Sequence, residues 1–117
     1  MIELPEEKNT YEFRVEDDTA VLSVSGAIDT ITSREFEKQI VKILSESDKF
    51  KSIKFDFRNV SYLSSSGLRV ILYTKQELMK KNPDYKLIIE DPKPKVMEIL
   101  DMTGFSEKIV DVEYSNK

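Results

Sequence analysis

The sequence contains no cysteine and no histidine. The absence of cysteine excludes disulfides, thiol catalysis and thiolate metal sites, and the absence of histidine removes the commonest general base and metal ligand. Most familiar catalytic constellations are therefore excluded. We expect a protein that is not an enzyme and that binds no cofactor or metal.

Long apolar runs and an excess of basic residues are also missing. No apolar segment approaches the roughly 20 residues that cross a bilayer, and the amino terminus lacks the basic-then-apolar order of a secretory signal. The 22 acidic and 18 basic residues are interspersed and give a net charge of −4. A broad positive surface for phosphate backbones is therefore absent. We expect a cytoplasmic protein that neither enters a membrane nor binds nucleic acid.

Glycine is scarce as well. The three glycines, Gly26, Gly67 and Gly104, lie too far apart to form a phosphate-binding loop. No serine has the flanking glycines of a nucleophile elbow, which argues against serine hydrolase chemistry. With 117 residues, 39% of them hydrophobic, and no internal repeat or low-complexity linker, the chain fits a single domain over residues 1–117.

Apolar periodicity predicts the order of the secondary-structure elements. Residues 11–17 and 20–25 alternate as strands do, and Asp17–Thr19 between them suits a tight turn, so we expect an antiparallel hairpin. A helix of about four turns follows, capped by Thr30, Thr32 or Ser33. The remaining pattern predicts strands over 51–57, 85–91 and 108–114, a helix from Ser65 or Ser66 to Asn82, and a helix over 94–102 that is closed by Gly104.

This order is ββαβαβα with an optional final strand. Strand–helix–strand units favour parallel pairing, whereas the initial hairpin is antiparallel. We therefore expect an α/β fold in which helices pack on a mixed sheet of four to five strands.

Two acidic segments resemble the magnesium-binding pocket of phosphotransfer receiver domains, an enzyme-like alternative. These segments are VEDD at 15–18 and Asp56, which lies near the end of a predicted strand. In a receiver, a helix follows the acidic pair, whereas the segment TAVLSVSG that follows here reads as a strand. We interpret Asp17 and Asp18 as a hairpin turn, and we expect Asp56 to lie on the solvent side or at the polar end of its strand.

Three serines and a glycine, Ser64–Gly67, separate a strand-like run from a helix-like run. One serine, Ser64 or Ser65, is enough to cap the helix, which is worth about 1 kcal/mol. The remaining small residues form an open patch at a helix amino terminus, where the helix dipole and free N–H groups favour a phosphoryl group. A phosphoserine there adds about −1.5 to −2 charges and weakens any protein contact that covers the patch.

These residues belong to a wider pattern. SGAID at 25–29, FDFRNVSYLSSSGLRVIL at 55–72 and PKVMEILDMTGF at 94–105 resemble the STAS domains of bacterial anti-sigma factor antagonists, over roughly residues 11–112. The resemblance implies that the unphosphorylated domain binds a serine kinase that doubles as an anti-sigma factor. It places the phosphorylated serine at Ser65, and phosphorylation of this serine would end the binding.

The resemblance also implies which residues form the partner-binding surface. It places Asp29 beside Ser65, and Asp29 is equally suited to cap the following helix. Arg69 either contacts an acidic group of the partner or is a solvated arginine. The expected partner-binding residues are Asp29, Ser64, Ser66, Gly67 and Arg69.

The chain departs from common family patterns in several places. Ser64 stands where many members carry aspartate and Ala27 where many carry glutamate, so the patch is less acidic and Ser64 is a competing acceptor. Relatives often continue into a final helix, so we expect Met102, Phe105 or Ile109 to be unusually exposed. We expect a monomer or a weak homodimer. STAS domains also serve as accessory modules of transporters or lipid-transport complexes without phosphoryl switching, and this alternative stays open.

Overall fold

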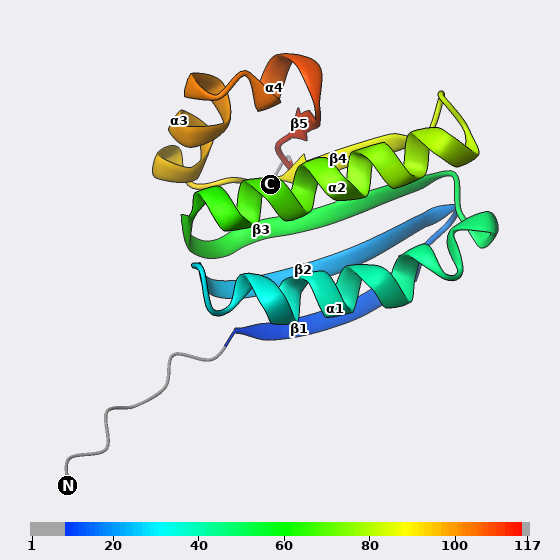
Figure 1. Ribbon diagram of the computed structural model, residues 1–117, viewed down its shortest axis with the longest axis horizontal. Helices are drawn as coiled ribbons and strands as arrows, with labels where there is room; N and C mark the ends of the chain where they lie inside the picture. Colours follow the sequence, from blue (N-terminus) through cyan, green and yellow to red (C-terminus); the bar gives the residue numbers. More distant parts are fainter. Residues whose placement is uncertain (1–8, 116–117) are drawn as a thin grey trace, which may run out of the picture.

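Strands and helices alternate along the computed structural model, which describes residues 9–115 (Figure 1). In chain order the elements are β1 (Thr10–Glu16), β2 (Thr19–Ile28), α1 (Ser33–Leu44), the 3-10 helix η1 (Ser47–Lys49), β3 (Ser52–Leu63), α2 (Ser65–Lys81), β4 (Lys86–Glu90), α3 (Pro94–Met102), α4 (Phe105–Lys108) and β5 (Asp111–Glu113). The strands form one sheet in the order β1-β2-β3-β4-β5. Because β1 is antiparallel to β2 and the other neighbours are parallel, the predicted mixed α/β fold is confirmed.

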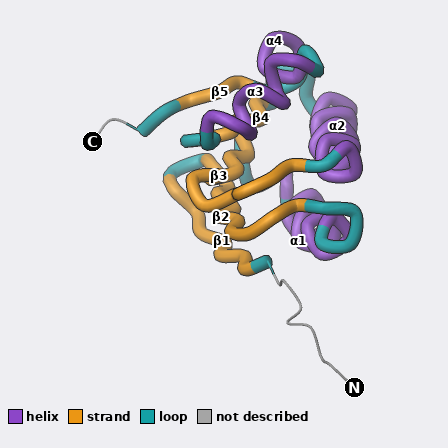
Figure 2. Tube along the Cα trace, turned by 90° about the vertical axis from the view of Figure 1, so that its left-hand side faces the viewer, coloured by secondary structure: helices purple, strands orange, loops and turns teal. Residues whose placement is uncertain are grey.

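The two long helices form one layer on one face of the sheet. Figure 2 shows α1 and α2 side by side against this face, whereas α3 and α4 lie toward β4 and β5 (Figure 1). No helix within residues 9–115 is long and apolar enough to cross a membrane. The layer leaves the amino-terminal ends of α1 and α2 next to each other at one end of the molecule (Figure 1).

An aromatic cluster holds the helix layer to the sheet. Phe55 and Phe57 are two residues apart on β3, so both side chains point to its helix-facing side, where they are fully buried. The ring of Phe36, on α1, lies 5.3 Å from that of Phe55 and 6.2 Å from that of Phe57. Such aromatic contacts add to the free energy gained by burying these large side chains.

β3 is longer than the predicted strand over 51–57 and runs to Leu63. Register shifts against β2, between Ser23 and Ser25 and between Gly26 and Ala27, break the simple alternation on which the prediction relied. β4 pairs only with Ser52–Asp56, so the second half of β3 pairs with β2 alone, and α3 packs against β3. This extension carries the chain directly to the start of α2.

The helices agree with the sequence prediction except in one respect, the short helix α4, which was not predicted. α1 begins at Ser33 with Thr32 in the N-cap position, one of the predicted caps, although the Thr32 side chain makes no cap hydrogen bond. Gly104 has a φ of +79° immediately after α3, as expected for a left-handed cap. Met102 is 78% exposed, as expected, whereas Phe105 and Ile109 pack partly buried against the core because α4 turns them inward.

Removal of the Phe36 ring tests the aromatic cluster. We expect Phe36→Ala to lower the free energy of unfolding by about 3–5 kcal/mol, because it leaves a cavity against two buried rings. The matched variant Val41→Ala removes a half-exposed side chain from the same helix, and we expect a change within about 0.5 kcal/mol. Urea denaturation of both variants measures the difference, and equal losses would contradict this account of the core.

Candidate partner-binding site

Ser64 caps α2. Its backbone is extended, with φ −83° and ψ 170°, and its Oγ accepts a hydrogen bond from the Gly67 N–H at 3.2 Å. The Ser64 N–H donates to the Ile28 carbonyl oxygen at 2.8 Å, which ties the helix start to the end of β2. Ser64 is only 8% exposed. Of the two serines that the sequence offered as the cap, Ser64 fills this role.

Ser65 is the first residue of α2 and is exposed to solvent. Because Ser64 supplies the cap, the Ser65 hydroxyl makes no hydrogen bond to another atom of residues 9–115. The first turn of α2 carries no acidic side chain that would repel an added negative charge. The hydroxyl predicted to accept a phosphoryl group is therefore accessible, at the positive end of a helix of 17 residues.

Gly67 is buried because the first turn of α2 approaches the sheet closely. A Cβ atom at this position would lie 2.7 Å from the Leu63 Cδ1 atom and 2.8 Å from the Ile28 Cγ2 atom, and both distances are too short for carbon atoms that are not bonded to each other. Gly67 and Ser64 therefore have roles in packing and capping, and they offer little surface to a partner. Of the predicted partner-binding residues, Asp29, Ser66 and Arg69 stay at least partly exposed.

Asp29 organises the loop between β2 and α1. Its Oδ1 atom accepts hydrogen bonds from the backbone N–H groups of Ile31 and Thr32, at 2.9 and 2.8 Å, and from the Thr32 hydroxyl at 3.0 Å. The bond from the Thr32 backbone is the main cause of a lowered pKa for this carboxyl group. Because Asp29 follows Ile28, which binds the backbone of Ser64, the two loops lie side by side. Asp29 thus holds the turn that precedes α1. Contrary to the expectation, it does not cap the helix itself, because α1 begins at Ser33 with Thr32 in the N-cap position and no side-chain cap.

A groove of about 400 Å³ runs between α1 and α2 from this end of the molecule. Two predicted site residues, Ser66 and Arg69, line one wall. Arg34 and Glu37 of α1 stand on the other wall, so the groove presents two guanidinium groups and one carboxylate. Its lining residues are Thr30, Ser33, Arg34, Glu37, Ser66, Arg69, Val70 and Tyr73. Sequence reasoning missed the contribution of α1, since the pairing of two amphipathic helices leaves no local signal.

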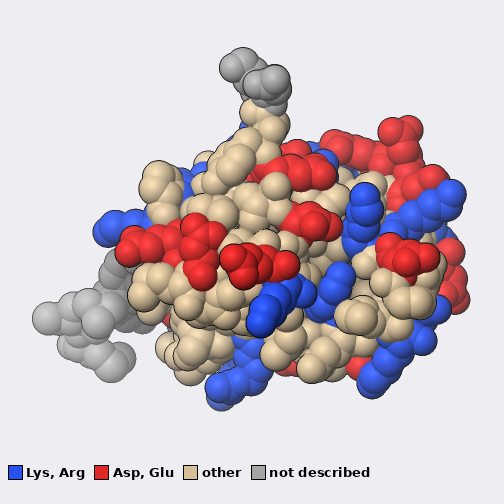
Figure 3. All heavy atoms as spheres, turned by 90° about the horizontal axis from the view of Figure 1, so that it is seen from above, with Lys and Arg blue, Asp and Glu red and all other residues tan. Residues whose placement is uncertain are grey.

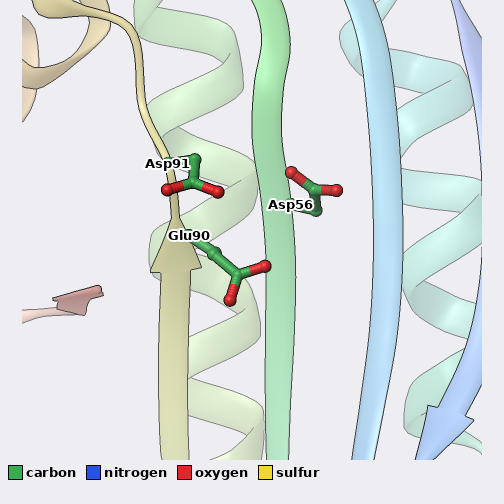
Figure 4. A group of neighbouring side chains, drawn as sticks. All are labelled: Asp56, Glu90 and Asp91. Carbon is green, nitrogen blue, oxygen red and sulfur yellow. The ribbon is translucent and has the colours of Figure 1, made fainter. Parts of the chain in front are cut away.

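The sequence led us to expect Asp56 on the solvent side or at the polar end of its strand, and this expectation is wrong. Asp56 is 7% exposed and lies in the middle of β3, on the face away from α1 and α2. Figure 4 shows its carboxylate turned toward those of Glu90 and Asp91 at the end of β4, and ligand atoms of the three lie within 4.8 Å of one another. The expectation failed because it ignored the strand that pairs alongside.

Cations of the protein itself balance these three carboxylates. Arg58 contacts Asp56 at 3.1 Å and Asp91 at 3.0 Å, and Lys54 contacts Glu90 at 3.2 Å. Ser23 also donates a hydrogen bond to Asp56. The arrangement is that of an ion-pair network rather than a receiver pocket, in which the acceptor carboxylate stands at the end of a strand beside a cation site.

Charges of both signs are mixed on the surface. Seen from above, acidic and basic side chains alternate over the face that includes α3 and α4 (Figure 3). No continuous basic area covers this face of the described residues (Figure 3).

The capping role of Ser64 leads to a comparison of adjacent serines. We expect Ser64→Ala to lower the free energy of unfolding by about 1 kcal/mol, because the Gly67 N–H loses its acceptor. Ser65→Ala should change it by less than about 0.5 kcal/mol, because that hydroxyl is solvated. Chemical denaturation measures both values. Equal losses would show that the cap is not specific to Ser64.

The hydrogen bonds of Asp29 predict a dependence of stability on pH. Because its pKa lies below the ordinary value of 3.8, the ionised form stabilises the fold above that pH, and the contribution disappears as the pH falls through the lower pKa of the folded state. We expect Asp29→Asn to be less stable than wild type at neutral pH and the difference to vanish in acid. Thermal unfolding at several pH values measures it, and a difference that is constant with pH would contradict this role.

Comparison with known proteins places this geometry in context. The STAS domain family model matches residues 10–116. The chain is 22% identical over 89 residues to BtrV of Bordetella bronchiseptica, a protein that carries the name of an anti-sigma factor antagonist, and the match covers 76% of this chain and 73% of BtrV.

Solved structures share the fold. An anti-sigma factor antagonist from Mycobacterium paratuberculosis superimposes with a TM-score of 0.78 at 24% identity, covering 91% of this chain and 86% of that one. The anti-sigma factor antagonist SpoIIAA in its unphosphorylated form gives 0.75 at 18% identity, covering 92% and 90%. The Bacillus SpoIIAA in its phosphorylated form gives 0.68 at 17% identity, covering 92% and 93%. The family match extends over nearly all of the described residues, and the chain therefore belongs to the STAS domain family.

Proposed function

We propose that this protein is an anti-sigma factor antagonist whose partner is a serine kinase of the anti-sigma type. The unphosphorylated protein binds the kinase through the surface around the start of α2, and phosphorylation of Ser65 ends the binding. Membership of the STAS family and the printed names of the similar proteins support this assignment. The observation that carries it is the exposed Ser65 hydroxyl beside a serine that already fills the cap.

The docking surface combines residues of one loop and two helices. Ser65, Ser66 and Arg69 contribute from α2, and Asp29 contributes from the loop before α1. Small side chains at the helix start allow a partner to approach the backbone closely, while Arg69 and Arg34 at the adjacent groove favour an acidic group of the partner. The chain itself is not an enzyme in this proposal and acts in the cytoplasm beside its partner.

The kinase supplies ATP and the catalytic groups. The Ser65 Oγ attacks the γ-phosphorus, the bond between that phosphorus and the bridging oxygen breaks, ADP leaves, and the hydroxyl proton passes to a base of the kinase. Ser64 is a poorer acceptor than the sequence suggested, because its hydroxyl is buried and engaged in the cap. Ser65 needs no unfolding of α2 to enter a kinase active site.

Phosphorylation changes the surface without disrupting the fold. A phosphoryl group on the first residue of α2 lies at the positive end of the helix dipole, so the helix stays intact. The same group brings about −1.5 to −2 charges to an interface built around an uncharged hydroxyl. Desolvating these charges against the kinase surface opposes binding, and each tenfold loss of affinity requires only about 1.4 kcal/mol.

Alanine variants at the two accessible serines test this proposal. With radioactive ATP and the anti-sigma kinases of the source organism, we expect wild type and Ser66→Ala to take up phosphate and Ser65→Ala to take up none. Ser65→Ala should bind the kinase as tightly as unphosphorylated wild type, whereas the phosphorylated protein should bind at least about tenfold more weakly.

The matched control is Ser61→Ala, which changes an exposed serine on β3 outside the proposed surface. Phosphate uptake by Ser65→Ala equal to that of wild type would contradict the assignment of the acceptor. Kinase affinity that is unchanged by phosphorylation would contradict the switch. Absence of uptake with every kinase would instead favour the role of a transporter accessory module.

A further inference from the structure

The outer edge of the sheet is formed by β1. Within residues 9–115, β1 pairs with β2 on one side and with no strand on the other, and Figure 1 shows it at the border of the sheet. Phe13 and Val15, on the helix-facing side of β1, are 45% and 53% exposed. α1 therefore covers this apolar row only in part.

Several usual protections of an edge strand are missing from β1. Natural edge strands are commonly very short, interrupted by a bulge, or marked by proline or by charged side chains, lysine above all. β1 has seven residues, contains neither proline nor lysine, and keeps a regular register with β2 from Thr10 to Glu16. Its charged residues, Glu12, Arg14 and Glu16, are of both signs and can therefore pair with one another across two strands. Its backbone is therefore ready to pair with one further strand.

We propose that β1 pairs in antiparallel fashion with β1 of a second copy of this chain, in the register centred on Phe13. In this register Glu12 faces Arg14 of the second copy and Arg14 faces Glu12 of the second copy, so the twofold axis produces two cross-strand ion pairs. On the other side, Phe13 meets its own counterpart, and Tyr11 meets Val15 twice. All seven residues of both strands take part.

Charge selects this register over its neighbours. A pairing centred on Glu12 brings two glutamates face to face, and one centred on Arg14 opposes two arginines and sets Glu12 against Glu16. A parallel pairing in register stacks every charge on itself. Pairings centred more than one residue away from Phe13 leave fewer residues of the two β1 strands facing each other. The register centred on Phe13 also allows a regular antiparallel hydrogen-bond ladder. Residues that face each other in it are both odd-numbered or both even-numbered, so their backbone N–H and C=O groups point toward the same edge of each strand.

The charged groups are available for these contacts. Arg14 donates from Nε to Glu16 at 2.7 Å and from Nη1 to Ser23 at 2.9 Å, whereas its Nη2 atom has no acceptor within residues 9–115. Glu12 is exposed and forms no ion pair within the same residues. The second copy supplies Glu12 with the counterion that it lacks and gives Arg14 a second carboxylate besides Glu16.

The apolar side gains cover at the same time. Phe13 lines a mostly apolar pocket of about 170 Å³ together with Leu22 of β2 and Ile43 of α1. Pairing about Phe13 places the second copy's apolar row beside Phe13, one of the residues that line this pocket. Because one strand pair buries much less surface than the roughly 1,200 Å² of a stable interface, we expect a weak, concentration-dependent dimer.

Complementary charge reversals test the register. We expect sedimentation equilibrium at protein concentrations up to about 1 mM to show self-association of the wild type. Glu12→Arg and Arg14→Glu should each lower the affinity of self-association at least about tenfold. When the two variants are mixed, two arginines on one strand face two glutamates on the other, so the variants should associate with each other. The double variant should recover self-association to near the wild-type level.

Glu98→Arg is the matched control, since it makes the same charge change on exposed α3, away from β1. It should leave self-association unchanged, and circular dichroism establishes that each variant is folded. A wild type that stays monomeric at every concentration would overturn the proposal. The register would be overturned if Glu12→Arg and Arg14→Glu weakened self-association no more than Glu98→Arg does. It would also be overturned if the two variants failed to associate with each other when mixed.

Discussion

The close contact between the first turn of α2 and the ends of β2 and β3 positions the candidate site. Gly67 packs against Ile28 and Leu63, where no larger side chain fits, and the Ser64 N–H binds the Ile28 carbonyl group. These contacts fix the direction in which α2 leaves the sheet. They also decide which serine is buried as a cap and which faces solvent.

The two faces of the sheet serve different purposes. The face toward α1 and α2 carries the aromatic cluster and provides most of the buried apolar surface. The opposite face is crossed by ion pairs that link β3 to β4 and β5 through Lys54, Arg58 and Asp91. Because several of these groups are largely removed from water, loss of one charge would leave its partner poorly solvated.

Features that depend on local sequence were predictable. The hairpin followed from the alternation of β1 and β2 and from the acidic turn, and Gly104 marked the end of α3 correctly. The start of α2 was also visible, because small polar residues precede an apolar stripe. The choice between Ser64 and Ser65 was not, since it depends on the backbone angles that packing of Gly67 imposes.

Features that depend on distant pairing were missed. The burial of Asp56 reflects its neighbours on β2 and β4, and the groove beside Ser66 reflects the approach of α1. The length of β3 was underestimated because bulges against β2 disturb its periodicity. This overhanging half of β3 has no strand beside it on the β4 side, and α3 packs against β3 instead. The strand that leads into Ser64 is thus supported by a helix as well as by its neighbouring strands. The serine loop consequently depends on the carboxyl-terminal part of the chain as well as on the elements that precede it.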